Sequence, residues 1–199
     1  MTAALSVLRA GTAQEHDRLE RSLDVVGLAR APEDYRRLLE AFWGLYAELE
    51  PRLESGLAEW AVLPGWSRRE TLGWLADDLR DLGCDAEGLR GLPRCTDLPV
   101  LADADSVWGC LYVVEGATLG GGVLATQLAG LPGVPARFFT NYGDARGRRW
   151  HRFRRALGDR LAGEGSLPAV TASARATFRT FELWCVPRAT AGRSWAGAR

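Results

Sequence analysis

A histidine followed one helical turn later by a carboxylate offers metal chemistry near the start of the chain. His16 and Glu20 are four residues apart in the segment EHDRLE, so on a helix their side chains are neighbours. A carboxylate in this position can hold the Nδ1 proton of the imidazole and leave Nε2 to bind a metal ion axially. A core histidine with a satisfied hydrogen bond is the alternative, and the pair taken alone favours that alternative.

Arg9 precedes His16 by seven residues, which is two helical turns. At a rise of about 1.5 Å per residue, its cation would project from the same side about 10 Å along the axis. This distance matches the separation between the iron of a porphyrin and its carboxylate rim. A solvated surface charge is the alternative, and Arg9 considered alone favours it.

Residues 106–128, SVWGCLYVVEGATLGGGVLATQL, contain five glycines in an otherwise apolar, helix-like segment. Each glycine costs a helix about 1 kcal/mol relative to alanine, so some other interaction must offset them. Gly116 and Gly120 are one turn apart, and Tyr112 is one turn before them. These residues predict a stripe without side chains beside a phenol, on which a flat ligand could lie; close helix packing is an equal alternative.

The elements that must position these residues are helices, because apolar residues recur at helical spacing and no strand-like alternation or internal repeat occurs. The sequence predicts an all-α, single-domain fold over residues 1–185 and a flexible tail over 186–199. The predicted helices cover residues 3–23, 32 to a break or kink at Pro51, 68–81, 105–129, 148–163 and 169–185. One face of the first helix is made by Leu5, Leu8, Thr12, His16, Leu19 and Leu23. Segments 83–99 and 131–147 are predicted connections, and Asp103, Asp105 and Ser106 are predicted caps.

Composition excludes several classes of function. The 25 basic residues balance 25 acidic ones, which argues against a nucleic-acid binder. All the basic residues are arginine, so Schiff-base lysine chemistry is excluded. Four cysteines without a C-x-x-C pair, and a start without a charged and then apolar leader, predict a cytoplasmic protein with reduced thiols. Residues 107–129 carry one charge, but their glycines favour a buried helix over a membrane span.

Two segments together resemble a known family. LRAGTAQEHDRLE (8–20) and LYVVEGATLGG (111–121) resemble the bacterial heme oxygenases, especially those associated with bacteriophytochromes. FFTNYG (138–143), RRWHRF (148–153) and ATFRTFE (176–182) extend the resemblance over about residues 5–185. The resemblance implies a helical fold that places heme between a proximal helix with the histidine ligand and a kinked, glycine-rich distal helix.

The resemblance also implies roles for individual residues. His16 would be the axial iron ligand and Glu20 its hydrogen-bond partner. Gly116 and Gly120 would cover the distal face and crowd bound dioxygen toward one meso carbon. The heme-binding set implied in this way is Arg9, Thr12, Glu20, Tyr112, Gly116, Gly120 and Phe178, with Arg9 and Tyr112 on the propionates and Phe178 lining the pocket.

The implied reaction is oxidative opening of heme to biliverdin, carbon monoxide and ferrous iron. Dioxygen would be the oxidant, and a separate ferredoxin, flavodoxin or reductase would supply the electrons. GATLGGG follows helical rather than strand residues, so it is not a dinucleotide-binding loop. A link to a bacteriophytochrome, whose chromophore the product would supply, is part of the same expectation; no membrane or nucleic-acid partner is expected.

One position departs from the family pattern. Mammalian members have an aspartate directly after the first distal glycine, which anchors the water that protonates bound oxygen, and this chain has Ala117 there. Thr118 would replace it only if its side chain points inward. A non-catalytic heme carrier or sensor therefore remains an alternative, as does a plain helical interaction protein. A di-iron oxidase is excluded because no Glu-x-x-His occurs.

Other polar residues have structural interpretations. Glu115 is turned about 100° from Gly116 at 3.6 residues per turn, so we expect it to pair with an arginine of another helix. His151 lies among Arg148, Arg149, Arg152, Arg154 and Arg155, which predicts a solvated basic face that could dock an acidic electron donor. The eight tryptophans, Trp150 among them, are expected to be packing residues.

Overall fold

The computed structural model describes residues 3–68 and 70–191. The described residues form nine helices and no strand, which confirms the predicted all-α fold. The five longer helices of the bundle are α1 (Ala3–Ser22), α3 (Pro32–Glu59), α6 (Ala104–Leu128), α8 (Ala145–Ala162) and α9 (Leu167–Ala189). The shorter ones are α2 (Val25–Ala29), α4 (Glu70–Asp81), α5 (Ala86–Gly91) and α7 (Arg137–Thr140).

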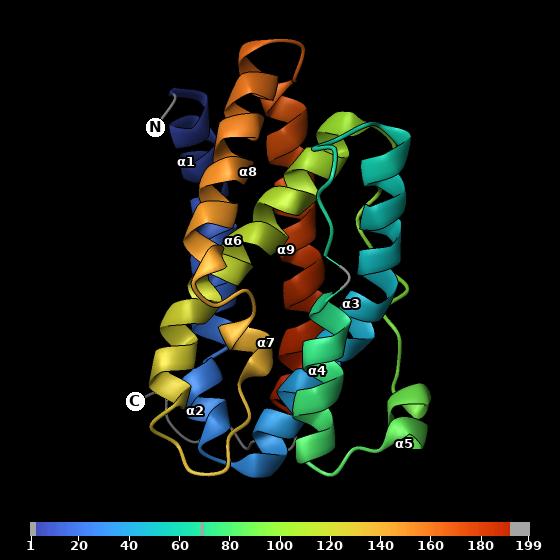
Figure 1. The fold of residues 1–199 in the computed structure, drawn as a ribbon, viewed down its shortest axis with the longest axis vertical. Coiled ribbons are helices and arrows are strands. Elements are labelled where there is room, and N and C mark those ends of the chain that lie inside the picture. Colours follow the sequence, from blue (N-terminus) through green and yellow to red (C-terminus); the bar gives the residue numbers. More distant parts are fainter. Residues whose placement is uncertain (1–2, 69, 192–199) are drawn as a thin grey trace.

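Helix α9 lies at the centre of the bundle and contacts α1, α3 and α6 (Figure 1). Its buried residues recur every three or four positions and include Val170, Ala174, Phe178 and Phe181, so one face of the helix is apolar. Helix α6 packs closely on it, because a Cβ on Gly109 would lie 2.4 Å from the carbonyl oxygen of Val170. Thus α9 is the base on which α1 and α6 are both positioned.

Helix α6 begins at a capping box. The Asp103 carboxylate accepts a hydrogen bond from the backbone N–H of Ser106, and the Ser106 hydroxyl accepts one from the Asp103 N–H. Asp105 has a different role from the predicted cap, because its carboxylate binds Arg160 of α8 and the backbone N–H of Ser166. The start of α6 is therefore fixed both locally and to the α8–α9 connection.

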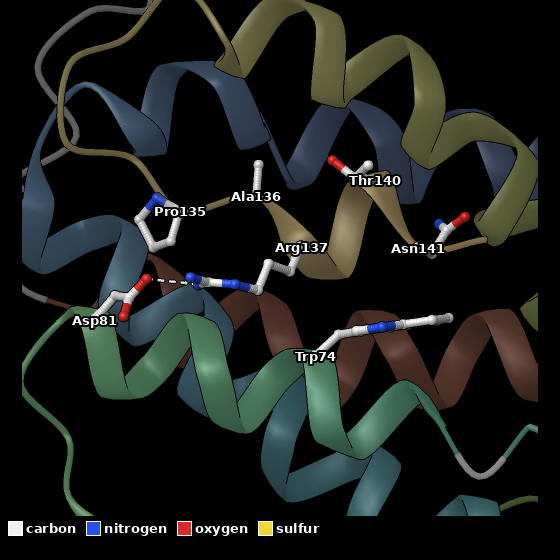
Figure 2. Close-up of a pocket in the computed structure, with 7 residues that line it drawn as sticks. All are labelled: Trp74, Asp81, Pro135, Ala136, Arg137, Thr140 and Asn141. Atoms are coloured by element: carbon white, nitrogen blue, oxygen red, sulfur yellow. Dashed lines mark hydrogen bonds and ion pairs between the residues drawn. The ribbon is translucent and has the colours of Figure 1, made fainter. Parts of the chain in front are cut away.

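Helix α7 is fastened to α4 by carboxylates. Asp81 Oδ2 lies 2.5 Å from Nη1 of Arg137 (Figure 2). The fully buried Asp78 accepts hydrogen bonds from the backbone N–H groups of Arg137 and Phe138. These bonds satisfy N–H groups of the first turn of α7, which have no partner within the helix.

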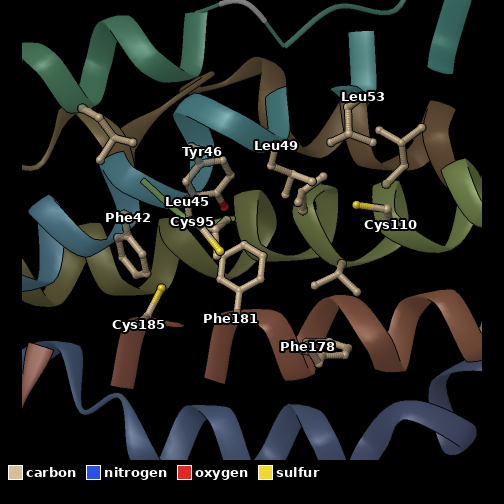
Figure 3. Packing of buried hydrophobic residues seen from close by; sticks show 14 of the residues in the cluster. Phe42, Leu45, Tyr46, Leu49, Leu53, Cys95, Cys110, Phe178, Phe181 and Cys185 are labelled. Atoms are coloured by element: carbon tan, nitrogen blue, oxygen red, sulfur yellow. The ribbon is translucent and has the colours of Figure 1, made fainter. Parts of the chain in front are cut away.

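Aromatic rings and thiols fill the space between α3, α6 and α9 (Figure 3). Tyr46 packs edge-on against Phe181 and Phe138, with ring centroids 5.6 Å apart in each pair. The four cysteines are buried and free. Burial raises the pKa of the Cys110 thiol to about 12, so this thiol is neutral and packs as an apolar group.

Of the break or kink predicted at Pro51, the break is wrong, because α3 continues through this residue to Glu59. A proline inside a helix costs roughly 3 kcal/mol. Leu49, Leu53 and Leu57 lie on both sides of Pro51 and are all buried. Their burial, at about 1.5–3 kcal/mol per side chain, offsets the missing hydrogen bond.

Several boundaries differ from the predicted ones. Helices α2, α5 and α7 have only four to six residues, too few to show a helical period. Helix α8 begins at Ala145, inside the predicted connection, and α9 runs to Ala189, into the predicted tail. Residues 192–199 of that tail lie outside the described residues.

Among the described helices, α6 alone has the length and apolar composition of a membrane span. However, 56% of its most apolar window is buried inside the bundle, and the helix packs against α3, α7, α8 and α9. This is how the core helix of a helical bundle packs, as the glycines of the segment predicted.

Candidate functional site

His16 differs from its neighbours on the inner face of α1 because its side chain is half exposed. Leu5, Leu8 and Thr12 are buried, whereas the His16 side chain is 50% exposed. Its Nδ1 lies 3.5 Å from the Glu20 carboxylate and 3.6 Å from that of Asp17. Since both carboxylates face Nδ1, Nε2 is the nitrogen left to bind a ligand.

Phe178 joins His16 to the centre of the bundle. Its ring packs edge-on against the imidazole, with centroids 5.7 Å apart and planes at 80°. Phe178 belongs to α9 and is buried, so it restricts rotation of a histidine on the neighbouring helix. The structure therefore brings these two residues of the predicted heme-binding set into contact.

The other predicted residues of α1 lie in different environments. Arg9 and Glu20 are exposed. Thr12 is buried, and its hydroxyl donates a hydrogen bond to the carbonyl oxygen of Leu8 at 3.0 Å. The hydroxyl proton of Thr12 is therefore bonded to the backbone of its own helix.

The five glycines of α6 separate into two groups by what surrounds them. A Cβ on Gly109, Gly121 or Gly122 would lie within 3.0 Å of atoms of α9, α7 or α8 respectively, so these glycines permit close packing. A Cβ on Gly116 would meet only Trp150, at 3.9 Å, and one on Gly120 would meet nothing within 4 Å. The backbones of α9 and α7 account for Gly109 and Gly121, and the Arg146 side chain accounts for Gly122. Gly116 has room for a Cβ in ordinary contact with Trp150 alone, and Gly120 faces open space; these two are the open glycines of α6.

Tyr112 and Trp150 flank the open glycines. Tyr112 is half-buried one turn before Gly116, and its ring lies 6.3 Å from that of Trp150 on α8. Trp150 also stacks on the buried ring of Phe153, at 5.5 Å and 20°. The sequence predicts Trp150 only as a packing residue, because its neighbour Gly116 lies on another helix and no local pattern links the two.

Ala117 and Thr118 follow the first open glycine. Ala117 is exposed, and the hydroxyl of Thr118 donates to the carbonyl oxygen of Val114 at 3.0 Å. The Thr118 proton is therefore used along its own helix, in the way common for threonine in helices.

The sequence model of the family described as Heme oxygenase matches residues 2–186 of this chain. The chain belongs to the heme oxygenase family. It is also 32% identical, over 152 residues, to a protein named heme oxygenase from Xanthomonas campestris pv. campestris (strain 8004). That alignment covers 75% of this chain and 87% of the relative, so the resemblance to the heme oxygenases is confirmed.

Membership of the heme oxygenase family implies that the chain binds heme and uses dioxygen. The donor set fits an iron porphyrin: a half-exposed imidazole with carboxylates at Nδ1, an aromatic ring against it, and two uncovered glycines on another helix. Helix α9 contacts both α1 and α6, and α8 does so as well. Helices α8 and α9 therefore both connect the helix of the histidine to the helix of the glycines.

Glu115 pairs with an arginine of another helix, as expected. Its carboxylate is buried and accepts hydrogen bonds from Trp66 Nε1 at 3.0 Å and from Arg149 Nε and Nη2, both at 2.9 Å. Arg68 Nη1 donates a further bond at 2.6 Å and also binds Glu50 through Nε. Burial favours the neutral acid, but the guanidiniums of Arg68 and Arg149 outweigh burial and hold the pKa of Glu115 below its usual value.

The prediction that Arg149 lies on the solvated basic face is wrong. Its side chain is only 16% exposed and lies between two rings, 3.8 Å from the centroid of Trp66 and 4.2 Å from that of Tyr142. The pull of a buried carboxylate on the facing helix explains the difference. Arg148, His151 and Arg155 are exposed, as predicted.

Two surface hollows lie near the site but contain no predicted heme residue. One, of about 530 Å³, lies between α4 and α7 and is lined by Trp74, Asp81, Arg137 and their neighbours (Figure 2). Its arginine is already bound to Asp78 and Asp81. The other, of about 540 Å³, lies between α6 and α8 and is lined by Leu119, Gly122, Val123, Thr126, Gln127, Gly143, Arg146 and Gly147.

Proposed function

We propose that this protein cleaves heme oxidatively to biliverdin, carbon monoxide and ferrous iron, using dioxygen and electrons from an external donor. The observation that carries the proposal is the half-exposed His16 on α1, with carboxylates at its Nδ1. Helices α8 and α9 each contact both α1 and α6, the helix that carries Gly116 and Gly120. Family membership supports the same activity.

In this proposal His16 binds the heme iron through Nε2. Glu20 accepts the Nδ1 proton in a hydrogen bond, which fixes the tautomer and orients the imidazole. Phe178 packs against the imidazole and limits its rotation. Bound heme supplies the iron centre at which dioxygen is reduced, and it is also the substrate whose ring is opened.

Gly116 and Gly120 act by the absence of side chains. With no Cβ, the α6 backbone can approach the distal face of the ring and exclude bulk water. Ala117 offers no polar group, and the Thr118 hydroxyl donates to Val114. Backbone carbonyl groups of α6 therefore hold the distal water in our proposal, while Arg9 and Tyr112 bind the propionates.

The remaining partners are also proposals. The donor is a ferredoxin, flavodoxin or reductase with an acidic surface, which would dock on the exposed Arg148, His151 and Arg155. We place the protein in the cytoplasm, with biliverdin passing to a bacteriophytochrome. The described chain through residue 185 is proposed to be the heme-binding domain.

An anaerobic hemin titration followed by reduction in air tests the proposal. We expect a Soret band in the wild type that, with ferredoxin reductase or ascorbate, gives way to a biliverdin band. His16→Ala should lose the heme complex or its characteristic Soret position. His151→Ala is the matched control for heme binding, because the chain has two histidines and this one is exposed on α8. It should form the wild-type heme complex and, with ascorbate as the reductant, cleave heme as the wild type does.

A non-catalytic heme carrier or sensor is the second candidate, favoured by Ala117 and the internally bonded Thr118. A Soret band that persists through repeated reduction in air, with no biliverdin band, would support the carrier and contradict the proposed reaction. An identical heme spectrum in His16→Ala would contradict the ligand assignment.

A further inference from the structure

We propose that Trp150 forms a side wall of the heme site and fixes the rotation of the ring within its plane, and hence the meso carbon that is cleaved. This inference rests on the proposed function. It makes Trp150 a specificity-determining residue that neither the family match nor the sequence pattern identified.

Trp150 lies on α8, a helix that packs against both α1 and α6. Helix α8 therefore closes one side of the space between His16 and the open glycines. Cη2 of Trp150 is the nearest atom to a Cβ placed on Gly116, at 3.9 Å. The indole therefore stands beside the bare backbone on which the ring is proposed to lie.

The indole of Trp150 is held in place by its neighbours. It stacks on Phe153, which is fully buried and packs against Trp66 and Trp108. The preceding residue, Arg149, is fixed by two hydrogen bonds to the buried Glu115. Both contacts restrain Trp150, so a ligand must adapt to the indole rather than displace it.

The hollow between α6 and α8 lies on the same side of these helices as Trp150 and the two glycines. Leu119 and Val123 share a helix face with Gly116 and Gly120, and Arg146 and Gly147 share one with Trp150. The hollow lined by these side chains and the Trp150–Gly116 contact therefore lie along the same seam between the two helices. A flat ligand over the open glycines meets the indole at one edge.

The chemistry of that edge selects the orientation. Cη2 is a carbon of the benzene ring of the indole, so the part of Trp150 nearest Gly116 is apolar. Burying a propionate against it would remove hydration without a hydrogen bond, whereas a methyl or vinyl edge gains from burial against an aromatic ring. Trp150 therefore excludes rotations that bring a propionate to this position.

The proton NMR spectrum of the cyanide-bound ferric heme complex tests this inference without turnover, because its heme methyl resonances report the orientation of the ring. The spectra of the wild type, Trp150→Phe, Trp150→Ala and Trp150→Arg are compared. For each protein the ratio of biliverdin isomers after turnover is measured as well. Trp43→Phe is the matched control, since Trp43 is a half-buried tryptophan on α3 whose indole N–H bonds to Leu89.

We expect one dominant set of methyl resonances in the wild type, Trp150→Phe and Trp43→Phe. Trp150→Arg introduces a propionate-binding cation and should change the ratio of orientations about tenfold, with a matching change in biliverdin isomers. Trp150→Ala should give mixed heme orientations. This variant tests the inference if the arginine variant does not fold. Unchanged methyl patterns in either variant that binds heme would overturn the inference, whereas absence of heme binding by the wild type would overturn the proposed function.

Discussion

At the scale of single residues, exposure separates His16 from the residues around it. Its side chain is half exposed on a face whose other members are largely buried. A histidine serving only the core would be covered and hydrogen-bonded within the protein. This arrangement means that the side chain can be removed without leaving a buried cavity.

We therefore expect His16→Ala to change the free energy of unfolding of the heme-free protein by less than about 0.5 kcal/mol. Its hemin dissociation constant should rise by at least about tenfold, because the bond to iron is lost. Urea unfolding and Soret titration measure the two quantities. Strong destabilisation with unchanged hemin affinity would mean that His16 is structural.

Glu115 shows the opposite behaviour, because its carboxylate is buried among the side chains of Arg68, Arg149 and Trp66. Replacing Glu115 with a neutral amide removes the negative charge that faces the guanidiniums of Arg68 and Arg149. Removing one partner of a buried ion pair costs about 3–5 kcal/mol. The cluster lies directly before Gly116, so it also fixes α8 against the open part of α6.

Glu115→Gln is expected to lower the free energy of unfolding by about 3–5 kcal/mol at pH 7. The folded pKa of Glu115 lies below its usual 4.5, so the stabilisation is complete above that pH and is lost as pH falls through the folded pKa. The difference between variant and wild type should shrink in acid. Glu164→Gln is the control, because the Glu164 side chain is 94% exposed; a pH-independent difference for Glu115→Gln would contradict the ionised carboxylate.

At the scale of elements, α6 carries glycines with two different purposes. Gly109 admits the backbone of α9, whereas Gly120 is surrounded by open space. The same substitution should therefore have opposite effects at the two positions. This contrast separates glycines needed by the fold from those proposed to face heme.

Gly120→Ala should raise the stability of the heme-free protein by up to about 1 kcal/mol, because alanine is the better helix former. It should also weaken hemin binding or slow cleavage, because the methyl group intrudes on the distal face. Gly109→Ala would place Cβ 2.4 Å from the Val170 carbonyl oxygen and should destabilise by about 1–3 kcal/mol. Thermal unfolding and hemin titration measure both effects, and an unchanged affinity and cleavage rate in Gly120→Ala would argue against a heme-facing stripe.

At the scale of the whole molecule, the proposed heme site is shared by α1, α6, α8 and α9. These helices come from both ends of the chain, and α9 contacts α1 and α6. A ligand that binds all of them favours the folded state as a unit. Heme binding is therefore linked to global unfolding.

Hemin at about 100 times its dissociation constant should stabilise the wild type by about 2.7 kcal/mol. For a chain of this length that corresponds to a rise in Tm of roughly 5–10 °C. Differential scanning calorimetry measures the rise, and His16→Ala at the same hemin concentration should show little of it. An equal rise in the variant would place hemin at a site that does not use His16.

Local features were predictable from the sequence because they depend on neighbours along the chain. The apolar face of α1, the Asp103–Ser106 cap and the glycine-rich α6 all follow from helical spacing and capping chemistry, and the family match agrees with the motifs found. Very short helices such as α7 lack a period, and their termini depend on distant partners such as Asp78.

Tertiary packing alone decided which residues meet across helices. Pro51 stays helical because leucines on both sides of it are buried, and Arg149 leaves solvent because Glu115 is buried opposite it. The sequence placed Gly116 and Gly120 on one stripe, but only the packed bundle left them uncovered and set Trp150 beside Gly116. Helical periodicity specifies which face of an element is apolar; the partner of that face depends on long-range packing, which no local pattern contains.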